Sequence, residues 1–242
     1  MPTIDCHVYW GPWPYPVPEL PVEELEALLR QFAVERACVA SSLAIMGDIE
    51  HGNEQLAQAI ESHPFFLGYA VINPNFVALS MEEMKKYLPR SQFCGAQMHM
   101  AYHAQALNSP ATRQLIKALL RFDKPILVHA RDAEDLAQLE ETVVEFPGQK
   151  FIVAEMGGLT WPAAVALADR RTNVVLDCGG SVADLDKIKV AVDAIGSNRL
   201  TFGSNCPLVH PAFVVGMVRD AQVDASAKER ILSGNARRLF KI

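Results

Sequence analysis

Short runs of apolar and β-branched residues recur along the chain at nearly even spacing, as expected for buried strands. The eight runs cover residues 3–9, 36–41, 66–72, 95–100, 125–129, 151–155, 174–177 and 200–203. Successive runs begin 23 to 33 residues apart, which is about the length of one strand plus a crossover helix. The pattern therefore predicts eight strand–helix units.

The segments between these runs have the periodicity of amphipathic helices. In the first, apolar residues fall at i, i+3, i+4 and i+7, namely Leu25, Leu28, Leu29 and Phe32. A later segment contains Leu185, Ile188 and Val192 at helical spacing, and Ser226 with Glu229 forms a capping-box pattern that predicts the start of a last helix. Eight such units favour a parallel α/β sheet closed into a single (β/α)8 TIM barrel over residues 1–242, because open doubly wound sheets more often have five or six strands.

Composition excludes several classes of function. The chain has 242 residues, 22 Lys and Arg against 28 Asp and Glu, and no basic run that would bind a nucleic-acid backbone. No apolar stretch approaches the roughly 18 residues of a membrane span, and the first residues lack the basic flank of a signal peptide. A cytoplasmic protein that acts on a small molecule is expected. A homodimer is the base-rate expectation for its assembly.

The five cysteines are scattered through the chain without CxxC spacing. A disulfide framework and a cysteine zinc site are therefore not indicated, and we expect reduced thiols.

Polar residues gather where the predicted strands end. In a barrel the carboxyl ends of the strands carry the active site, and here they present His7 and Tyr9, Gln97 and His99, His129, Glu155, Asp177 and Asn205. Because side chains alternate along a strand, His7 and Tyr9 share one face, as do Gln97 and His99. Imidazoles and a carboxylate that meet in one pocket suit zinc, manganese or iron, although polar residues also gather at barrel rims without a ligand.

The loop after the first strand, residues 10–18, combines prolines with Trp10, Trp13 and Tyr15. Its rings either pack on neighbouring loops to stiffen the rim or form an aromatic wall for a substrate. For the second interpretation, Trp10 and Trp13 are the candidate substrate-binding residues.

Several motifs, in order along nearly the whole chain, resemble those of the amidohydrolase-related metal-dependent hydrolases. This group includes pyrone-dicarboxylate lactonase-like enzymes and decarboxylases of aminocarboxymuconate semialdehyde and of resorcylate. The matching segments are residues 4–7, 52–53, 70–74, 95–99, 125–129, 157–158, 200–207 and 234–240. The resemblance implies a TIM barrel with a metal-dependent site at the carboxyl ends of its strands.

This sequence departs from the family pattern at the positions that matter most. The resemblance implies a metal held by two histidines of the first strand, a histidine from each of strands five and six, and an aspartate of strand eight that serves as base. His7 and His129 are kept, but Tyr9, Glu155 and Asn205 replace the other three, and Gln97 replaces a lysine.

Each replacement changes the expected chemistry. A neutral phenol makes Tyr9 a poor metal ligand and a better hydrogen-bond donor, and Asn205 cannot accept a proton. His7, His129 and Glu155 remain as a set for one divalent metal, zinc or manganese. Activation of water would then fall to Glu155, His99 or the metal.

Three functions stay open at this point. The first is a hydrolase of a small cyclic or carboxylated, lactone-like substrate, with water activated by the metal or by a His–Glu pair. Its expected catalytic residues are Glu155, Asn205 and His99, and Tyr9 and Gln97 hold the substrate. The alternatives are a decarboxylase on the same scaffold and a non-catalytic relative that binds a small molecule. Asp177 either anchors a loop or contacts the substrate, and Asp5 braces the barrel below the site.

Overall fold

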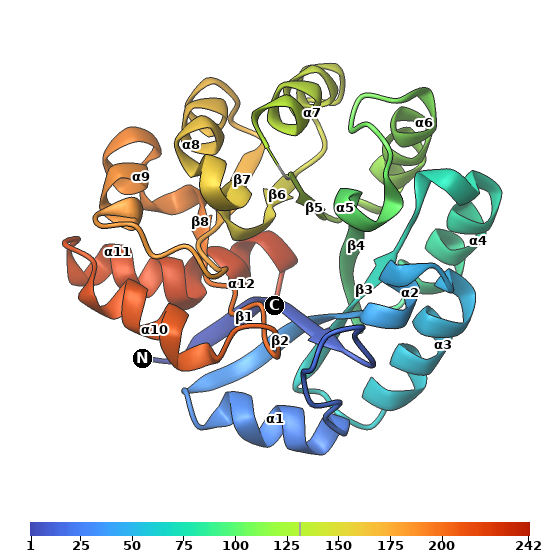
Figure 1. The fold of residues 1–242 in the computed structure, drawn as a ribbon, viewed down its shortest axis with the longest axis horizontal. Coiled ribbons are helices and arrows are strands. Elements are labelled where there is room, and N and C mark those ends of the chain that lie inside the picture. Colours follow the sequence, from blue (N-terminus) through green and yellow to red (C-terminus); the bar gives the residue numbers. More distant parts are fainter. Residues whose placement is uncertain (131) are drawn as a thin grey trace.

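The computed structural model describes residues 1–130 and 132–242. Eight parallel strands follow one another around the sheet in sequence order, with the helices outside them (Figure 1). The strands are β1 Thr3–Trp10, β2 Val34–Ser41, β3 Phe66–Val71, β4 Phe93–His99, β5 Ile126–His129, β6 Phe151–Val153, β7 Val174–Asp177 and β8 Leu200–Thr201. The (β/α)8 barrel predicted from the spacing of the apolar runs is confirmed.

The ring closes between its first and last strands although β8 has only two residues. The backbone N–H of Cys6 donates to the carbonyl of Phe202, and that of Tyr9 donates to the carbonyl of Cys206, each at 2.8 Å. These bonds continue the β1–β8 contact beyond the end of β8. They bring the residues after β8 beside the carboxyl end of β1.

The helices occupy the segments between strands. They are α1 Val22–Arg30, α2 Ser42–Met46, α3 Ile49–Ile60, α4 Val77–Tyr87, α5 Met100–His103, α6 Pro110–Leu119, α7 Ala133–Glu145, α8 Trp161–Arg170, α9 Lys187–Ile195, α10 Pro211–Asp220, α11 Ala225–Glu229 and α12 Asn235–Phe240.

Two details of the helix predictions are wrong. The helix α11 is capped by Asp224, whose Oδ1 accepts from Ala227 N, whereas Ser226 lies inside the helix and its hydroxyl bonds to Arg230. Leu185 lies before α9 and is 90% exposed. At α11 the acidic residue Asp224 caps the helix in place of Ser226, and at α9 the buried apolar positions begin with Ile188 rather than Leu185.

Alternate strand residues separate two apolar layers. Leu127 belongs to a cluster of inward-facing residues, whereas Ile126 and Val128 on the same strand pack with helical residues such as Leu136 in the outer layer. The five cysteines are free and buried, as expected. Within the described residues, no helix combines the length and the hydrophobicity that crossing a bilayer requires.

Candidate active site

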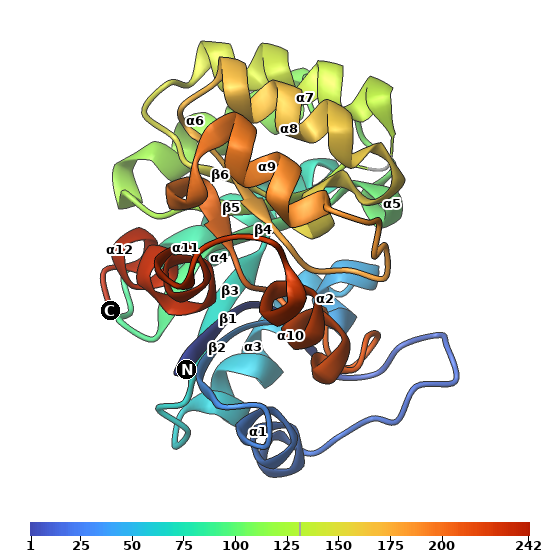
Figure 2. The same ribbon diagram turned by 90° about the vertical axis from the view of Figure 1, so that its left-hand side faces the viewer.

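The polar residues expected at the strand ends lie together at one end of the barrel. Figure 2 shows the loop after β1 and helix α5 at this end, and α12 with the C-terminus at the opposite end. The residues come from β1, β4 and β5 and from the turns after β6 and β8. His7, Tyr9 and Gln97 are at most 1% exposed, so most of this chemistry is shielded from bulk water.

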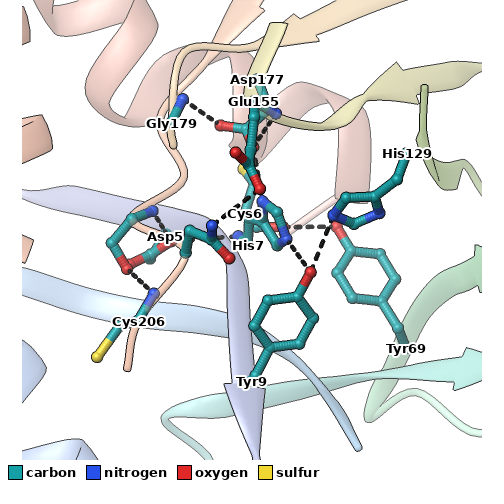
Figure 3. A network of polar contacts seen from close by, with 12 residues as sticks. Asp5, Cys6, His7, Tyr9, Tyr69, His129, Glu155, Asp177, Gly179 and Cys206 are labelled. Atoms are coloured by element: carbon teal, nitrogen blue, oxygen red, sulfur yellow. Dashed lines mark hydrogen bonds and ion pairs between the residues drawn. The ribbon is translucent and has the colours of Figure 1, made fainter. Parts of the chain in front are cut away.

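Three side chains form a continuous chain of hydrogen bonds, which we call the imidazole–phenol chain (His7, Tyr9 and His129). The Tyr9 hydroxyl lies between two imidazoles, 2.8 Å from Nε2 of His7 and 2.9 Å from Nε2 of His129 (Figure 3). The other ring nitrogen of His7, Nδ1, lies 2.8 Å from Oδ2 of Asp177. The chain therefore begins at a buried carboxylate and crosses from β1 to β5.

The positions of the protons in this chain follow from its chemistry. Because an Asp177 carboxylate only accepts, Nδ1 of His7 must carry a proton. Tyr9 then has one proton to share between two Nε2 atoms. Either His7 is neutral and accepts it while His129 donates back, or His7 is an imidazolium and Tyr9 donates to His129. With His129 neutral in both, the second state holds one more proton than the first, and that proton is on His7.

The surroundings favour positive charge at one end of the chain. Burial lowers the pKa of His7, but the hydrogen bond and charge of Asp177 more than offset it, so the pKa of His7 is raised. Burial holds the pKa of His129 well below its usual value and raises that of the Tyr9 phenol well above it. A proton that enters the imidazole–phenol chain is therefore stabilised on His7.

Glu155 and Asn205 form the second part of the site, which we call the Glu155–Asn205 pair. Nδ2 of Asn205 donates to Oε1 of Glu155 at 2.9 Å, and the backbone N–H of Glu155 donates to Oδ2 of Asp177 at 3.1 Å. Asp177 thus joins the pair to the imidazole–phenol chain. Burial raises the pKa of Glu155, which favours its protonated form.

The backbone that carries this pair is left-handed. Glu155, Met156 and Gly157 have φ of 54°, 55° and 76°, and Asn205 has φ of 61°. For residues with a side chain this conformation costs roughly 1–2 kcal/mol each, and such strain concentrates at functional sites. The turn packs closely against Gly180, where a Cβ would lie 2.5 Å from Oε2 of Glu155.

Other buried polar atoms near this point have no partner among the described residues. They include both amide atoms of Gln97, Nδ1 of His99, Nδ1 of His129 and Oδ1 of Asn205. Unpaired buried polar groups are costly, so these atoms indicate a place where water or a substrate binds. His99 stacks on His129 with ring centroids 3.9 Å apart, and burial lowers the pKa of His99 to about 3, which keeps it neutral.

The two tryptophans of the loop after β1 lie on different sides of the strand. Trp13 packs edge-on against Tyr9, with ring centroids 5.0 Å apart, and also contacts Tyr102, so it belongs to the site. Trp10 packs instead with the outer layer beside Val8. Trp10 directly follows the inward-facing Tyr9 and points to the other face, so the structure does not bring it together with Tyr9, Gln97 and Trp13.

The ligand set expected for a metal is arranged differently. Nδ1 of His7 is engaged by Asp177, and the Nε2 atoms of His7 and His129 both face the Tyr9 hydroxyl. Among residues 1–130 and 132–242, no three His, Cys, Asp or Glu side chains are grouped to hold a metal ion. The phenol occupies the point at which the two imidazoles would meet on a metal, so the set of His7, His129 and Glu155 does not fit one in this arrangement.

Two residues, Asp177 and Lys187, contribute more to the site than the sequence pattern indicates. Asp177 accepts from His7, from Glu155 and from the backbone of Gly179, and its position as the polar end of an apolar strand was a usable signal. Lys187 is 1% exposed and donates to the carbonyls of Glu155 and Val182 at 3.4 and 3.3 Å. No sequence pattern marks Lys187. Asp5 braces the site as expected, because its carboxylate accepts from the backbone N–H groups of His7 and Ser204.

The sequence matches one protein family, and the fold is similar to those of several solved structures. A family model described as Amidohydrolase matches residues 4–242. No curated protein matches the chain.

Three solved structures illustrate the structural likeness. A 2,6-dihydroxybenzoate decarboxylase from Rhizobium is 16% identical, with a TM-score of 0.79 over 99% of this chain and 98% of that chain. A 5-carboxyvanillate decarboxylase from Sphingomonas paucimobilis is 14% identical, with a TM-score of 0.79 over 100% and 99%. A dihydroxybenzoic acid decarboxylase from Polaromonas sp. JS666, with bound manganese and the inhibitor 2-nitroresorcinol, is 14% identical, with a TM-score of 0.80 over 99% and 97%. At these identities the likeness establishes the shared barrel fold.

Proposed function

The chain belongs to the amidohydrolase family, and we propose that it is a decarboxylase of a small hydroxylated aromatic or cyclic carboxylate that works by proton transfer without a bound metal. The observation that carries this proposal is the Tyr9 hydroxyl, which joins the two imidazoles at 2.8 and 2.9 Å. A phenol at that point connects the two imidazoles for proton transfer, which is the chemistry of general acid–base catalysis.

The proposed reaction needs one proton at carbon. Glu155, whose pKa is raised by burial, donates its proton to the ring carbon that bears the carboxylate. The bond from that carbon to the carboxylate then breaks, its electron pair returns to the ring, and CO2 leaves. The Glu155 carboxylate regains a proton from water, and the hydroxide that remains combines with CO2 as bicarbonate. Asp177 favours a positive charge on His7 through its hydrogen bond and its own charge.

Groups around the pair bind the substrate in this proposal. The unpaired amide of Gln97 donates to the carboxylate, and the neutral ring of His99 bonds to a ring hydroxyl. Trp13 closes one side with an aromatic surface. Binding among side chains as buried as Tyr9 and Gln97 weakens the solvation of the carboxylate, which favours its loss.

Lactone hydrolysis, the first expectation from the sequence, is less well supported. Hydrolysis requires a base that removes a proton from water. Asn205 cannot accept one, burial favours the protonated form of Glu155, and the low pKa of His99 makes that ring a weak base. The solved structures named above are described as decarboxylases, which favours the decarboxylase alternative. The family name and the strained backbone at Glu155 both argue against a purely non-catalytic relative. The homodimer and the cytoplasmic location stay predictions from the sequence.

The test uses the purified protein after treatment with a strong chelator. We expect release of CO2 from at least one member of a panel of hydroxybenzoates that includes 2,6-dihydroxybenzoate and 5-carboxyvanillate. The rate should not rise on addition of Mn2+ or Zn2+, and elemental analysis should find neither metal at stoichiometric level.

Two outcomes would contradict the proposal in separate ways. Hydrolysis of a simple lactone such as dihydrocoumarin, with no CO2 release from any member of the panel, would overturn decarboxylation. Activity that disappears with the chelator and returns with Mn2+ would overturn the metal-independent mechanism while keeping the reaction.

A further inference from the structure

A cavity lies at the end of the barrel opposite the candidate active site. It has a volume of about 310 Å3 and is bounded by the segments that lead into β5, β6, β7 and β8 and by α12. Figure 2 shows α12 and the C-terminus at this end, away from α5 and the loop after β1. The lining residues include Val175 of β7 and Thr201 of β8. The cavity is therefore separate from the Glu155–Asn205 pair and from the imidazole–phenol chain.

Positive charge is concentrated around this cavity. Its lining contains one carboxylate, that of Asp123, and five cationic side chains, which are Lys124, Lys150, Arg199, Arg238 and Lys241. The chain as a whole has a net charge of −6, so this concentration runs against its overall composition. A small anion in the cavity would meet several cations at once.

Most of these cations are not neutralised by the protein. Lys241 pairs with Asp123. Arg238 donates to the carbonyl of Asn198 at 2.7 Å, Arg199 to the carbonyl of Arg171 at 3.1 Å, and Lys124 to the carbonyl of Arg90 at 3.1 Å. Carbonyl groups satisfy the N–H donors but leave the positive charge in place. Within residues 1–130 and 132–242, no carboxylate lies within ion-pair distance of Lys124, Lys150, Arg199 or Arg238.

The walls of the cavity also include apolar surface and an unused hydrogen-bonding group. Leu120, Pro125, Val175 and Leu239 line it alongside the cations. The Thr201 hydroxyl is fully buried and has no partner among the described residues. Arginine and lysine side chains bind carboxylate and phosphate groups, and the apolar wall suits a hydrocarbon part of the same molecule.

From these features we infer that the cavity is a binding site for a small organic anion, a phosphate ester or a polycarboxylate with an apolar part. The charged group lies among the lysine and arginine side chains. The apolar part packs against Leu239 and Val175. The volume is at the lower end of the range for small-molecule sites, which limits the ligand to about the size of one substituted ring.

Calorimetric titration with phenyl phosphate, at low ionic strength, tests this inference. The test variant is Lys150→Gln with Arg238→Gln, which removes two charges from the cavity lining. The matched control is Lys117→Gln with Arg219→Gln, which removes two charges from α6 and α10. We expect one site in the wild-type protein and in the control, and a Kd raised about tenfold or more in the test variant.

Two further arms identify the site and the ligand class. Inorganic phosphate should bind more weakly than phenyl phosphate, because it lacks the apolar part. The variant His129→Gln should bind phenyl phosphate as the wild-type protein does. The inference is overturned if the wild-type protein does not bind, if test and control variants weaken equally, or if His129→Gln abolishes binding and so places the ligand in the active site.

Discussion

The imidazole–phenol chain rests on regular strand backbone, whereas the Glu155–Asn205 pair rests on left-handed backbone. His7 and Tyr9 lie in β1 and His129 ends β5. Glu155 and Asn205 follow β6 and β8 and both have positive φ. The first group is therefore held in place by the sheet itself. The second needs tertiary contacts to hold a costly conformation, which is typical of residues that act on a substrate.

We expect the largest loss of kcat from a change in the regular part of the site, the imidazole–phenol chain. Tyr9→Phe removes the hydroxyl between His7 and His129, and we expect kcat for decarboxylation to fall by about 10²–10⁴-fold. The unfolding free energy should fall by about 1–3 kcal/mol, because two buried nitrogen atoms lose their partner. Steady-state kinetics and urea denaturation measure the two effects.

Tyr69→Phe is the matched control for this change. Tyr69 is also fully buried in the barrel, and its hydroxyl donates to the carbonyl of Cys6 at 2.9 Å. It should lose comparable stability and keep its kcat. Equal losses of kcat in both variants would show that Tyr9 acts only through stability.

Glu155→Gln removes the proposed proton donor from the left-handed part of the site while keeping the hydrogen bond to Asn205. We expect kcat to fall by about 10²-fold. In the wild-type protein, activity should decline as pH rises through the raised pKa of Glu155, because the proton donor is lost. This decline should disappear in the variant, as a pH–rate profile of kcat would detect.

The chain offers a second buried Glu–Asn pair as a control. Oε2 of Glu83 accepts from Asn53 at 2.9 Å, and burial raises its pKa as well. Glu83→Gln should leave both kcat and the pH–rate profile unchanged. A shift in the profile for Glu83→Gln would assign the pH dependence to a general effect of buried carboxylates.

Gly180→Ala should displace Glu155 while leaving every proposed catalytic side chain unchanged. A Cβ at this position would meet Oε2 of Glu155 at 2.5 Å, and the residue has φ of +84°. We expect about a tenfold loss of kcat because Glu155 is displaced. Gly196→Ala carries a similar backbone strain, at φ of +73°, with no atom within 4 Å of the added Cβ. It should lose a similar amount of stability with no change in kcat, and equal kinetic effects would contradict the displacement.

Asp5, which supports the regular part of the site, bears on stability and its pH dependence rather than on kcat. Burial raises the pKa of Asp5 to about 7 from 3.8. Between those two pH values the folded protein binds more protons than the unfolded chain, so its stability falls as pH rises, by up to about 4 kcal/mol. Asp5→Asn should remove this dependence. Its unfolding free energy should exceed that of the wild-type protein at pH 8 and approach it near pH 4, and unchanged pH dependence in urea denaturation would refute the assignment to Asp5.

The barrel and most of the regular part of the site could be predicted from the order of residues along the chain. Eight apolar runs at even spacing require eight buried strands, and strand alternation places His7 with Tyr9 and Gln97 with His99. These are local properties of the chain, so they are visible in one sequence.

The hydrogen-bond partners of these residues depend on contacts between distant segments and became visible in the folded structure. The Tyr9 hydroxyl meets His129 across 120 positions of sequence, and Asp177 meets His7 across 170. The left-handed turn at Glu155 has Gly180 and Lys187 as neighbours, and Trp10 lies on the strand face opposite to that of Tyr9. Hydrogen bonds between distant segments, and the backbone strain that they stabilise, leave no periodic signal in the sequence.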